Sequence, residues 1–446
     1  MGAVEVVLAL VVLATAVAAL AERMRAPAPS LLVLAGLAVA LVPGVPDVQV
    51  TPQVVSLVVL PPLLFAAAQD VPVRDLRTVV GPVVALAFGL VAVTAVVVAV
   101  AVHAVLPEVP LAAAFVLGAV LASTDPVAVT ALSRRLRLPP RVATLVQAES
   151  LFNDATSLVL FTVAVDVVVS GGPVDLGAAA VTFVVLGAGG AAVGAAAAGV
   201  AAFVRGRTED SLVETSVALL TPYAAYVAAE SAHTSGVTAV VVCGVVLAGR
   251  GPLLTRAATR LQVSAVYEVL VFLLESVVFA VIGLQLPLLV RRLGTDEHGG
   301  TGFVLPALLV VAATVLVRML WVWPTARLPR LLSRGSARSA PSWRSIAVVS
   351  WAGTRGVVPL AAALSIPLTV QGGRPFPARG LLLVLATSVI VVTLVGQGLT
   401  LAPLVRRLGV LDDPAAAREE ELRVPGVLGR FYTLKRKSTM SPSAIT

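Results

Sequence analysis

The most informative stretch of the chain reads AESLFNDA and covers residues 148–155. It places two acids, Glu149 and Asp154, and a carboxamide, Asn153, within a run over 142–168 that is otherwise apolar. That run exceeds the roughly 20 residues that an α-helix needs to cross a bilayer. Ionised side chains are costly in hydrocarbon, so acids at this depth indicate an ion or proton pathway.

The composition around this stretch is that of a helical membrane protein. Of 446 residues, 58% are hydrophobic and 13% are charged, and the mean hydropathy is +1.00. Soluble domains carry roughly 25% charged residues. The apolar runs do not alternate with a period of two, so the spans are expected to be helices. The net charge of +8 is explained by arginines in short loops, and no nucleic acid partner is expected. No P-loop pattern occurs, so ATP-driven transport is not expected. Enzyme motifs are absent as well, and we expect neither an enzyme nor a cofactor.

Hydropathy predicts an all-α, polytopic fold with about thirteen membrane-spanning helices. Their predicted ranges are 3–20, 30–43, 53–69, 79–102, 111–132, 142–168, 177–204, 211–230, 236–249, 263–290, 303–323, 345–369 and 380–405. The loops alternate in charge: every second loop is rich in arginine, and these loops together hold eighteen arginines, whereas the other loops together hold four. Because positive loops stay in the cytoplasm, we expect a plasma-membrane protein with its N-terminus outside and its C-terminus inside. Residues 1–408 would form the membrane domain, and residues 409–446 a short, charged cytoplasmic tail.

Two predicted spans are interrupted by polar residues, proline or glycine. One carries STDP at 123–126, and the other carries WAGTRGVVP at 351–359. Such breaks survive at membrane depth where they are buried in protein or line a cavity. The two spans are seven apart in the series and therefore run in opposite directions, which predicts an inverted repeat with the transport site at the breaks.

The acids of the two polar motifs are expected to meet in one site. On a helix, Ser150 and Asp154 are four residues apart and share a face. Thr124 and Asp125, from the first interrupted span, could join them. Together these side chains offer two carboxylates and two hydroxyls, a suitable oxygen cage for a hard cation such as Na⁺. The alternative is a buried, protonated acid that only bonds to neighbouring helices.

Other charged residues within spans need partners. Arg355 lies in the second interrupted span, and Glu149 is its preferred counter-charge; the alternative is that the arginine reaches the cytoplasmic interface. Arg318 is expected to pair with an acid on another helix, which the sequence leaves open. Glu275 could serve structure or the ion pathway. Glu230, at the predicted outer surface, could attract cations or simply be solvated.

The polar motifs resemble those of a known family. The motifs are STDPV at 123–127, ESLFND at 149–154, GTRGVV at 353–358, LPPLLF at 60–65 and FAVIGL at 279–284. In these residues the chain resembles the monovalent cation:proton antiporters of the NhaP-like sodium/proton exchanger type. The motifs are spread over most of the membrane part, about 55–400.

The resemblance implies a fold and a mode of assembly. It implies thirteen helices with two crossed, discontinuous ones in a core domain, which we assign to about 79–168 and 303–405. The remaining helices would form a dimerisation scaffold, and the protein would be a homodimer.

The resemblance also implies exchange of Na⁺ for H⁺ and the role of each site residue. Asp154 would be the essential ion-binding acid. The cation site would be completed by Asp125, Thr124 and Ser150, and its supporting network would be Glu149, Asn153 and Arg355. Asn153 directly before the acid is associated with electroneutral, one-for-one exchange. Ala66 stands where many relatives carry a glutamate, which leaves the preference among Na⁺, K⁺ and Li⁺ open.

The expected mechanism is competition in a dehydrated pocket. A bound cation stabilises the carboxylate of Asp154 and expels its proton, so the site carries one or the other. Alternating access would then carry each across the membrane and support pH homeostasis. The alternatives are a K⁺/H⁺ antiporter on the same scaffold, a symporter for an organic anion, and a passive monovalent cation channel. A channel would need a continuous polar lining or a carbonyl filter, and the polar residues instead gather at one depth.

Overall fold

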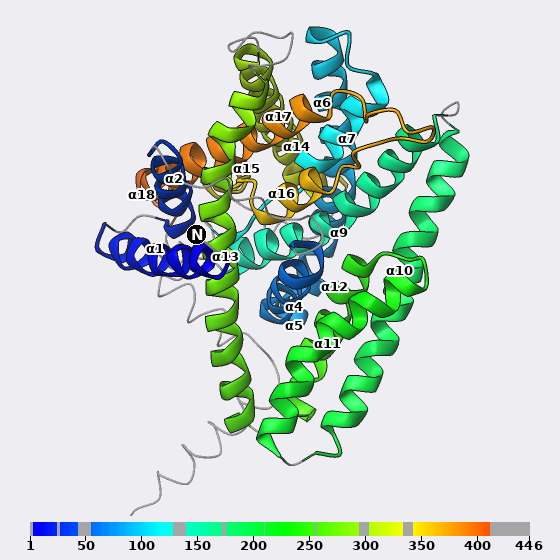
Figure 1. The fold of residues 1–446 in the computed structure, drawn as a ribbon. Helices are drawn as coiled ribbons and strands as arrows, with labels where there is room; N and C mark the ends of the chain where they lie inside the picture. The colour runs from blue at the N-terminus through cyan, green and yellow to red at the C-terminus, as the bar shows by residue number, and fades with distance from the viewer. Residues whose placement is uncertain are drawn as a thin grey trace, which may run out of the picture.

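The computed structural model describes residues 3–24, 27–42, 55–127, 140–171, 175–208, 210–254, 257–293, 303–332 and 342–410. Over these ranges the protein is helical, with one isolated pair of bridged residues, Thr369 and Pro375, and no strand. The α-helices shown in Figure 1 are α1 Ala3–Met24, α2 Ala28–Ala40, α4 Leu60–Asp70, α5 Val73–Val84, α6 Val91–Val105, α7 Leu111–Ala122, α9 Pro140–Ser170, α10 Leu176–Arg205, α11 Ser211–Ser231, α12 Gly236–Leu254, α13 Ala257–Leu293, α14 Val304–Leu332, α15 Trp343–Trp351, α16 Val357–Leu364, α17 Arg379–Val392 and α18 Gly398–Leu408. Three π-helical segments adjoin them: η1 Val55–Val59, η2 Ala85–Leu90 and η3 Thr393–Gln397.

Seven helical segments in the described ranges are long and apolar enough to cross a membrane. Five shorter apolar helices accompany them. Every range predicted from hydropathy contains helical residues. The expectation of an all-α fold with many apolar helices is therefore confirmed, whereas thirteen crossings remains a prediction. Of the predicted cytoplasmic tail, residues 411–446 lie outside the described part of the chain.

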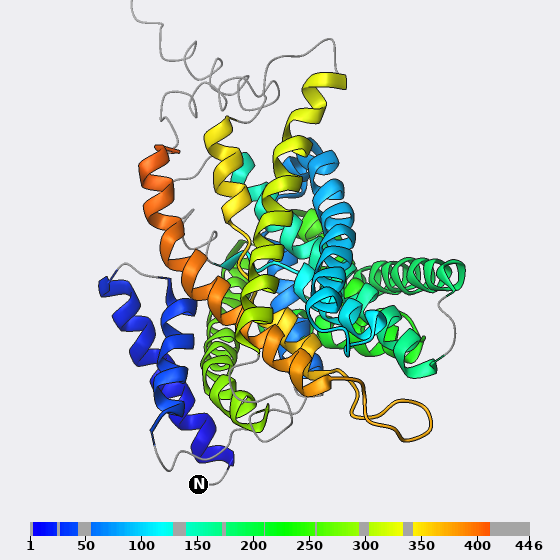
Figure 2. The ribbon, with the colours of Figure 1, turned by 90° about the horizontal axis from the view of Figure 1, so that it is seen from above.

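Helices α1 and α2 lie at one edge of the molecule beside α13, and α10 lies at the opposite edge (Figures 1 and 2). Glycines let α2 and α13 approach closely. A Cβ atom on Gly36 would lie 2.1 Å from the carbonyl oxygen of Ala280, and one on Gly283 would lie 2.1 Å from the carbonyl oxygen of Val33. Close backbone contact through small residues is a common way for helices to pack in membranes, where lipid is as apolar as a leucine side chain.

Both interrupted spans contain a polar, non-helical break, and the second one is helical on either side of it. Helix α7 ends at Ala122 and is followed by non-helical backbone over 123–126. Helix α15 ends at Trp351, and α16 starts only after the non-helical segment 352–356. The interruptions thus lie where the prolines, glycines and polar residues predict them. The chain beyond Val127 on the first span lies outside the described residues, so the crossing of the two spans and the inverted repeat remain predictions.

The π-helical segment η2 was not predicted. It lies between α5 and α6, where the indole N–H of Trp321 on α14 donates to the carbonyl oxygen of Ala85 at 3.0 Å. The ring of Trp321 occupies the space of a missing side chain at Gly89, since a Cβ there would lie 2.5 Å from it. The extra residue in the helical turn frees a carbonyl, and the tryptophan satisfies it.

Candidate functional site

The site is built where α9 passes the two non-helical segments. The segments bond to each other: the backbone N–H of Asp125 donates to the carbonyl oxygen of Thr354 at 2.7 Å. The hydroxyl of Thr354 donates in return to the carbonyl oxygen of Asp125 at 3.0 Å. Each break leaves backbone groups without a helical partner, and these groups pair across the junction.

Helix α9 meets the first segment through a buried polar network. The hydroxyl of Ser150 donates to the carbonyl oxygen of Thr124 at 2.7 Å. The amide of Asn153 donates to the hydroxyl of Thr124 at 2.7 Å. The hydroxyl oxygens of Thr124 and Ser150 are 3.3 Å apart. All three side chains are buried. Three residues that the sequence assigned to the site therefore lie together.

The two predicted ion-binding acids lie in the same buried region. Asp154 is 7% exposed and accepts a hydrogen bond from the hydroxyl of Ser123. Asp125 is 9% exposed, and its carboxylate accepts the backbone N–H of Val127 at 2.8 Å. The two carboxylates are close enough to interact electrostatically. Neither acid is exposed, so neither is simply a solvated surface group.

Asp125 also explains a glycine in the second segment. A Cβ atom on Gly356 would lie 1.6 Å from a carboxylate oxygen of Asp125. Only a residue without a side chain fits there while the carboxylate keeps its place. The GTRG part of the second motif is thus complementary in shape to the acid of the first motif.

The expected pairing of Glu149 with Arg355 is wrong. Glu149 forms a two-pronged ion pair with Arg318 of α14, one nitrogen to each carboxylate oxygen, with the second contact at 3.0 Å. Arg318 also donates to the carbonyl oxygen of Val349 at 3.0 and 3.2 Å. Glu149 is 0% and Arg318 1% exposed, so the pair is fully buried. The sequence indicated that Arg318 needed an acid, but spacing along the chain carries no information on a partner 169 residues away.

Arg355 is buried but bonds to carbonyl oxygens. Its Nε–H donates to the carbonyl oxygen of Leu121 at 3.1 Å, and a terminal nitrogen donates to that of Gly353. Leu121 lies in the last turn of α7, where carbonyls lack helical partners and carry partial negative charge. Arg355 therefore caps the broken end of α7 and does not reach the cytoplasmic interface.

Residues outside this cluster are placed as follows. Glu275 is half-buried on α13 and close enough to Asp125 for electrostatic interaction. Glu230 is exposed at the end of α11. Ala66 is half-buried on α4. Sequence reasoning did not assign Ser123 to the site, although it precedes Thr124 in the same motif. In the described ranges no group of three or more histidine, cysteine, aspartate or glutamate residues could hold a metal ion.

A set of apolar helices enclosing buried acids at paired helix breaks defines a class of protein: a multi-pass membrane transporter, not an enzyme. The family described as "Sodium/hydrogen exchanger, transmembrane" matches residues 7–407. The chain belongs to this family, whose members exchange cations for protons.

Individual relatives agree with the family assignment. A protein of Mycobacterium tuberculosis named as an uncharacterized Na⁺/H⁺ exchanger is 37% identical over 94% of this chain and 77% of its own length. A sodium, potassium, lithium and rubidium/H⁺ antiporter of Bacillus subtilis is 34% identical over 83% of this chain and 56% of its own length. The fold resembles that of the sodium proton antiporter from Methanocaldococcus jannaschii, with a TM-score of 0.70, 20% identity, and coverage of 91% of this chain and 98% of the other.

Proposed function

We propose that the protein exchanges one monovalent cation, Na⁺ in the first place, for one proton at a site centred on Asp154. The observation that carries the proposal is the buried carboxylate of Asp154 beside that of Asp125. Two like charges in a dehydrated pocket are unfavourable unless a cation or a proton is present. Binding of the cation therefore displaces the proton, and binding of the proton displaces the cation. This coupling makes the protein an exchanger.

The oxygen atoms for a transported cation come from both interrupted segments and α9. Carboxylates of Asp154 and Asp125 and hydroxyls of Thr124 and Ser150 form the proposed ligand set. Hard cations take such oxygen ligands. The two hydroxyl oxygens lie 3.3 Å apart, which supports their acting together on one ion.

The surrounding groups hold the site without taking part in exchange. The Glu149–Arg318 ion pair neutralises two charges next to Asp154. Arg355 caps α7, and Asn153 fixes the hydroxyl of Thr124. With these groups paired, the carboxylates of Asp154 and Asp125 carry the charge that an exchanged ion neutralises. We assign the exchanged proton to Asp154 alone, and one cation replacing one proton there makes the exchange electroneutral.

Movement of the site between the two membrane faces completes the proposal. The hydrogen bonds between the segments at 125 and 354 support two crossed, discontinuous helices. We assign the moving core to about 79–168 and 303–405, and a dimerising scaffold to the other helices of a homodimer. The arginine distribution supports an N-terminus outside and a C-terminus in the cytoplasm.

The test is an ion-jump experiment on purified protein in proteoliposomes with an internal pH dye. Addition of Na⁺ should alkalinise vesicles loaded at acid pH, and Asp154→Asn should abolish this response without loss of folded protein. Clamping the membrane potential with valinomycin and K⁺ should leave the Na⁺ response unchanged if exchange is one-for-one. Retained Na⁺-dependent proton flux in Asp154→Asn would remove Asp154 from the centre of the mechanism.

K⁺/H⁺ exchange on the same scaffold is a second candidate, because the relative from Bacillus subtilis is named for potassium as well as sodium. Repeating the ion jump with K⁺, Li⁺ and Na⁺ ranks the three ions. A saturating, proton-coupled response supports an antiporter, whereas an ohmic current without proton movement supports a channel.

A further inference from the structure

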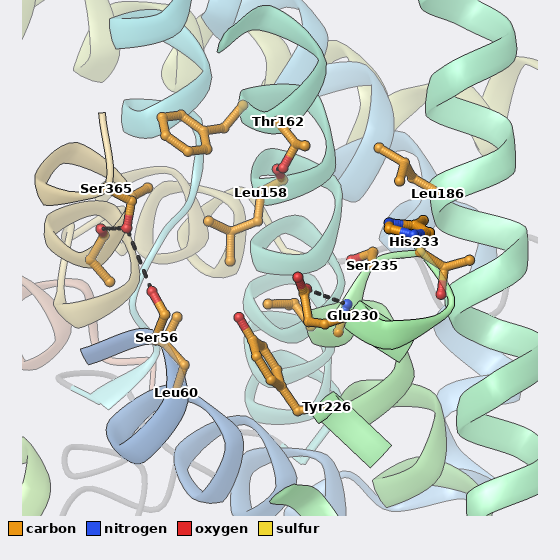
Figure 3. A pocket seen from close by; sticks show the side chains of 16 residues that line it. Ser56, Leu60, Leu158, Thr162, Leu186, Tyr226, Glu230, His233, Ser235 and Ser365 are labelled. Carbon is orange, nitrogen blue, oxygen red and sulfur yellow. Dashed lines mark hydrogen bonds between the residues drawn. The ribbon is translucent and has the colours of Figure 1, made fainter. Parts of the chain in front are cut away.

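A cavity of about 390 Å³ lies between two groups of helices, and neither Asp125 nor Asp154 lines it (Figure 3). One wall comes from α9 and α16, including Thr162 and Ser365. The other comes from η1, α4, α10, α11 and the start of α12, including Ser56, Tyr226 and Glu230. The cavity therefore separates the helices that carry the proposed ion site from helices of the proposed scaffold.

Helix α9 links this cavity to Asp154. Leu158 and Thr162 lie four and eight residues after Asp154, so all three share a face of the helix. Thr162 is exposed in the cavity, Leu158 is half-buried, and Asp154 is buried. Leu158 packs against two separate apolar clusters. Leu158 therefore lies in the wall of the cavity, one helical turn from the acid.

The cavity has one acid fixed in its wall. The carboxylate of Glu230 accepts the backbone N–H of Gly236, at the start of α12, at 3.2 Å (Figure 3). A Cβ on Gly236 would lie 2.9 Å from that carboxylate and 2.7 Å from the ring of Tyr226. The glycine thus leaves room for both side chains. Among the described lining residues Glu230 is the only acid, and His233 is the only side chain that could become a cation.

The surrounding oxygen atoms suit a partly hydrated cation. Tyr226, Ser235, Thr162 and Ser365 contribute hydroxyl groups to the lining. A single carboxylate among hydroxyls attracts a cation without stripping it of water, whereas Asp125 and Asp154 lie in a drier place. The arginine distribution puts the loop between α11 and α12 on the outer face of the membrane.

We propose that this cavity is an outer capture site, where Glu230 holds a hydrated monovalent cation before it passes Leu158 to reach Asp154. The inference rests on the proposed exchange function. It adds a second, weaker cation site on one side of the membrane, with its own acid.

The first experiment compares Glu230→Gln with Glu108→Gln, an exposed acid of a different loop at the same predicted face. Right-side-out and inside-out vesicles are both assayed at about pH 8. Loss of one nearby charge should raise the apparent KM for Na⁺ added from outside by roughly three- to tenfold at low ionic strength. The maximal rate and the KM from inside should not change. The effect should shrink when choline chloride screens the charge.

An unchanged outer KM in Glu230→Gln, with wild-type maximal rate, overturns the capture site and leaves the exchange function intact. An equal rise from both sides also overturns it, since that result describes a structural defect. Glu230→Asp should restore most of the affinity if charge is what matters. Absence of Na⁺-dependent exchange in the unmodified protein would instead remove the exchange function itself.

The second experiment leaves Glu230 untouched. Cys243 is the only cysteine in the sequence and is buried, so Thr162→Cys supplies one accessible thiol. A cationic methanethiosulfonate added outside should block exchange through Thr162→Cys, and a small neutral reagent should inhibit much less. Glu108→Cys serves as the control and should tolerate both reagents. Failure of the cationic reagent to inhibit from outside, or inhibition only from inside, would overturn the proposal.

Discussion

Two acids five residues apart on α9, Glu149 and Asp154, have different hydrogen-bond partners. Glu149 is neutralised by Arg318 in a buried, two-pronged ion pair. Asp154 instead accepts a hydrogen bond from the neutral hydroxyl of Ser123. The contrast follows from which neighbour each residue faces, not from the residue types. Glu149 therefore has a structural role, whereas Asp154 is free to bind a proton or a cation in turn.

The hydroxyl of Ser123 should tune the competition at Asp154. A hydrogen bond to a charged acceptor contributes about 1.5–3 kcal/mol, so its loss in Ser123→Ala favours the protonated acid over the ionised one. Protons then compete better, and the apparent KM for Na⁺ should rise about tenfold, most strongly at low pH. Dye-reported exchange over a series of pH values measures this. Ser157→Ala is the control, because that hydroxyl bonds to the carbonyl oxygen of Ala119. Equal effects of the two variants would contradict a specific role for Ser123.

Removing one partner of the buried ion pair should destabilise the protein far more than replacing both partners by uncharged residues. Arg318→Met leaves Glu149 buried without a counter-charge, a change worth about 3–5 kcal/mol of stability. The double variant Glu149→Gln with Arg318→Met should recover most of that loss. Thermal unfolding of the purified protein in detergent gives the comparison. If the double variant melts as low as Arg318→Met alone, the pair is not what couples these residues.

At the scale of elements, the sequence predicted where the helices and their breaks lie better than it predicted which side chains pair. The apolar runs predicted where helices lie, and proline and glycine in STDP and WAGTRGVVP predicted both breaks. The polar spacing on α9 predicted that Ser150 and Asp154 would meet the first break. The partner of Glu149 was missed, because pairing depends on how α14 lies against α9. The π-helical segments were missed because one extra residue in a turn leaves no mark in apolar periodicity.

The fit between the two breaks should be sensitive to one methyl group. In Gly356→Ala the new Cβ would lie 1.6 Å from the carboxylate of Asp125, so either the segment or the acid must move. Misplacement of a site by about 1 Å can cost roughly a hundredfold in rate, and exchange should fall by that order. Gly199→Ala on α10 is the matched control, since nothing lies within 4 Å of its new Cβ. Proteoliposome exchange rates at equal protein content decide the outcome. Near-normal exchange in Gly356→Ala would mean that Asp125 does not need its present position.

At the scale of the whole molecule, the cavity of Figure 3 separates two groups of helices, and a pair of serine hydroxyls spans it. The side-chain oxygens of Ser56 on η1 and Ser365 after α16 are 3.5 Å apart (Figure 3). Ser56 belongs to the proposed scaffold, and Ser365 belongs to the proposed core. If the core moves against the scaffold to change access, this distance has to change during each transport cycle.

A covalent link between these positions should therefore stop transport. In Ser56→Cys with Ser365→Cys, oxidation should abolish exchange, and a reducing agent should restore it. The matched control is Ser342→Cys with Ser345→Cys, since those hydroxyl oxygens are 2.9 Å apart at the start of α15, both in the proposed core. That link should leave exchange unchanged. Cys243 is buried and does not compete. Mass spectrometry confirms each link before the ion jump is measured. Wild-type exchange in the fully linked Ser56–Ser365 variant would show that transport does not require the core to move away from η1.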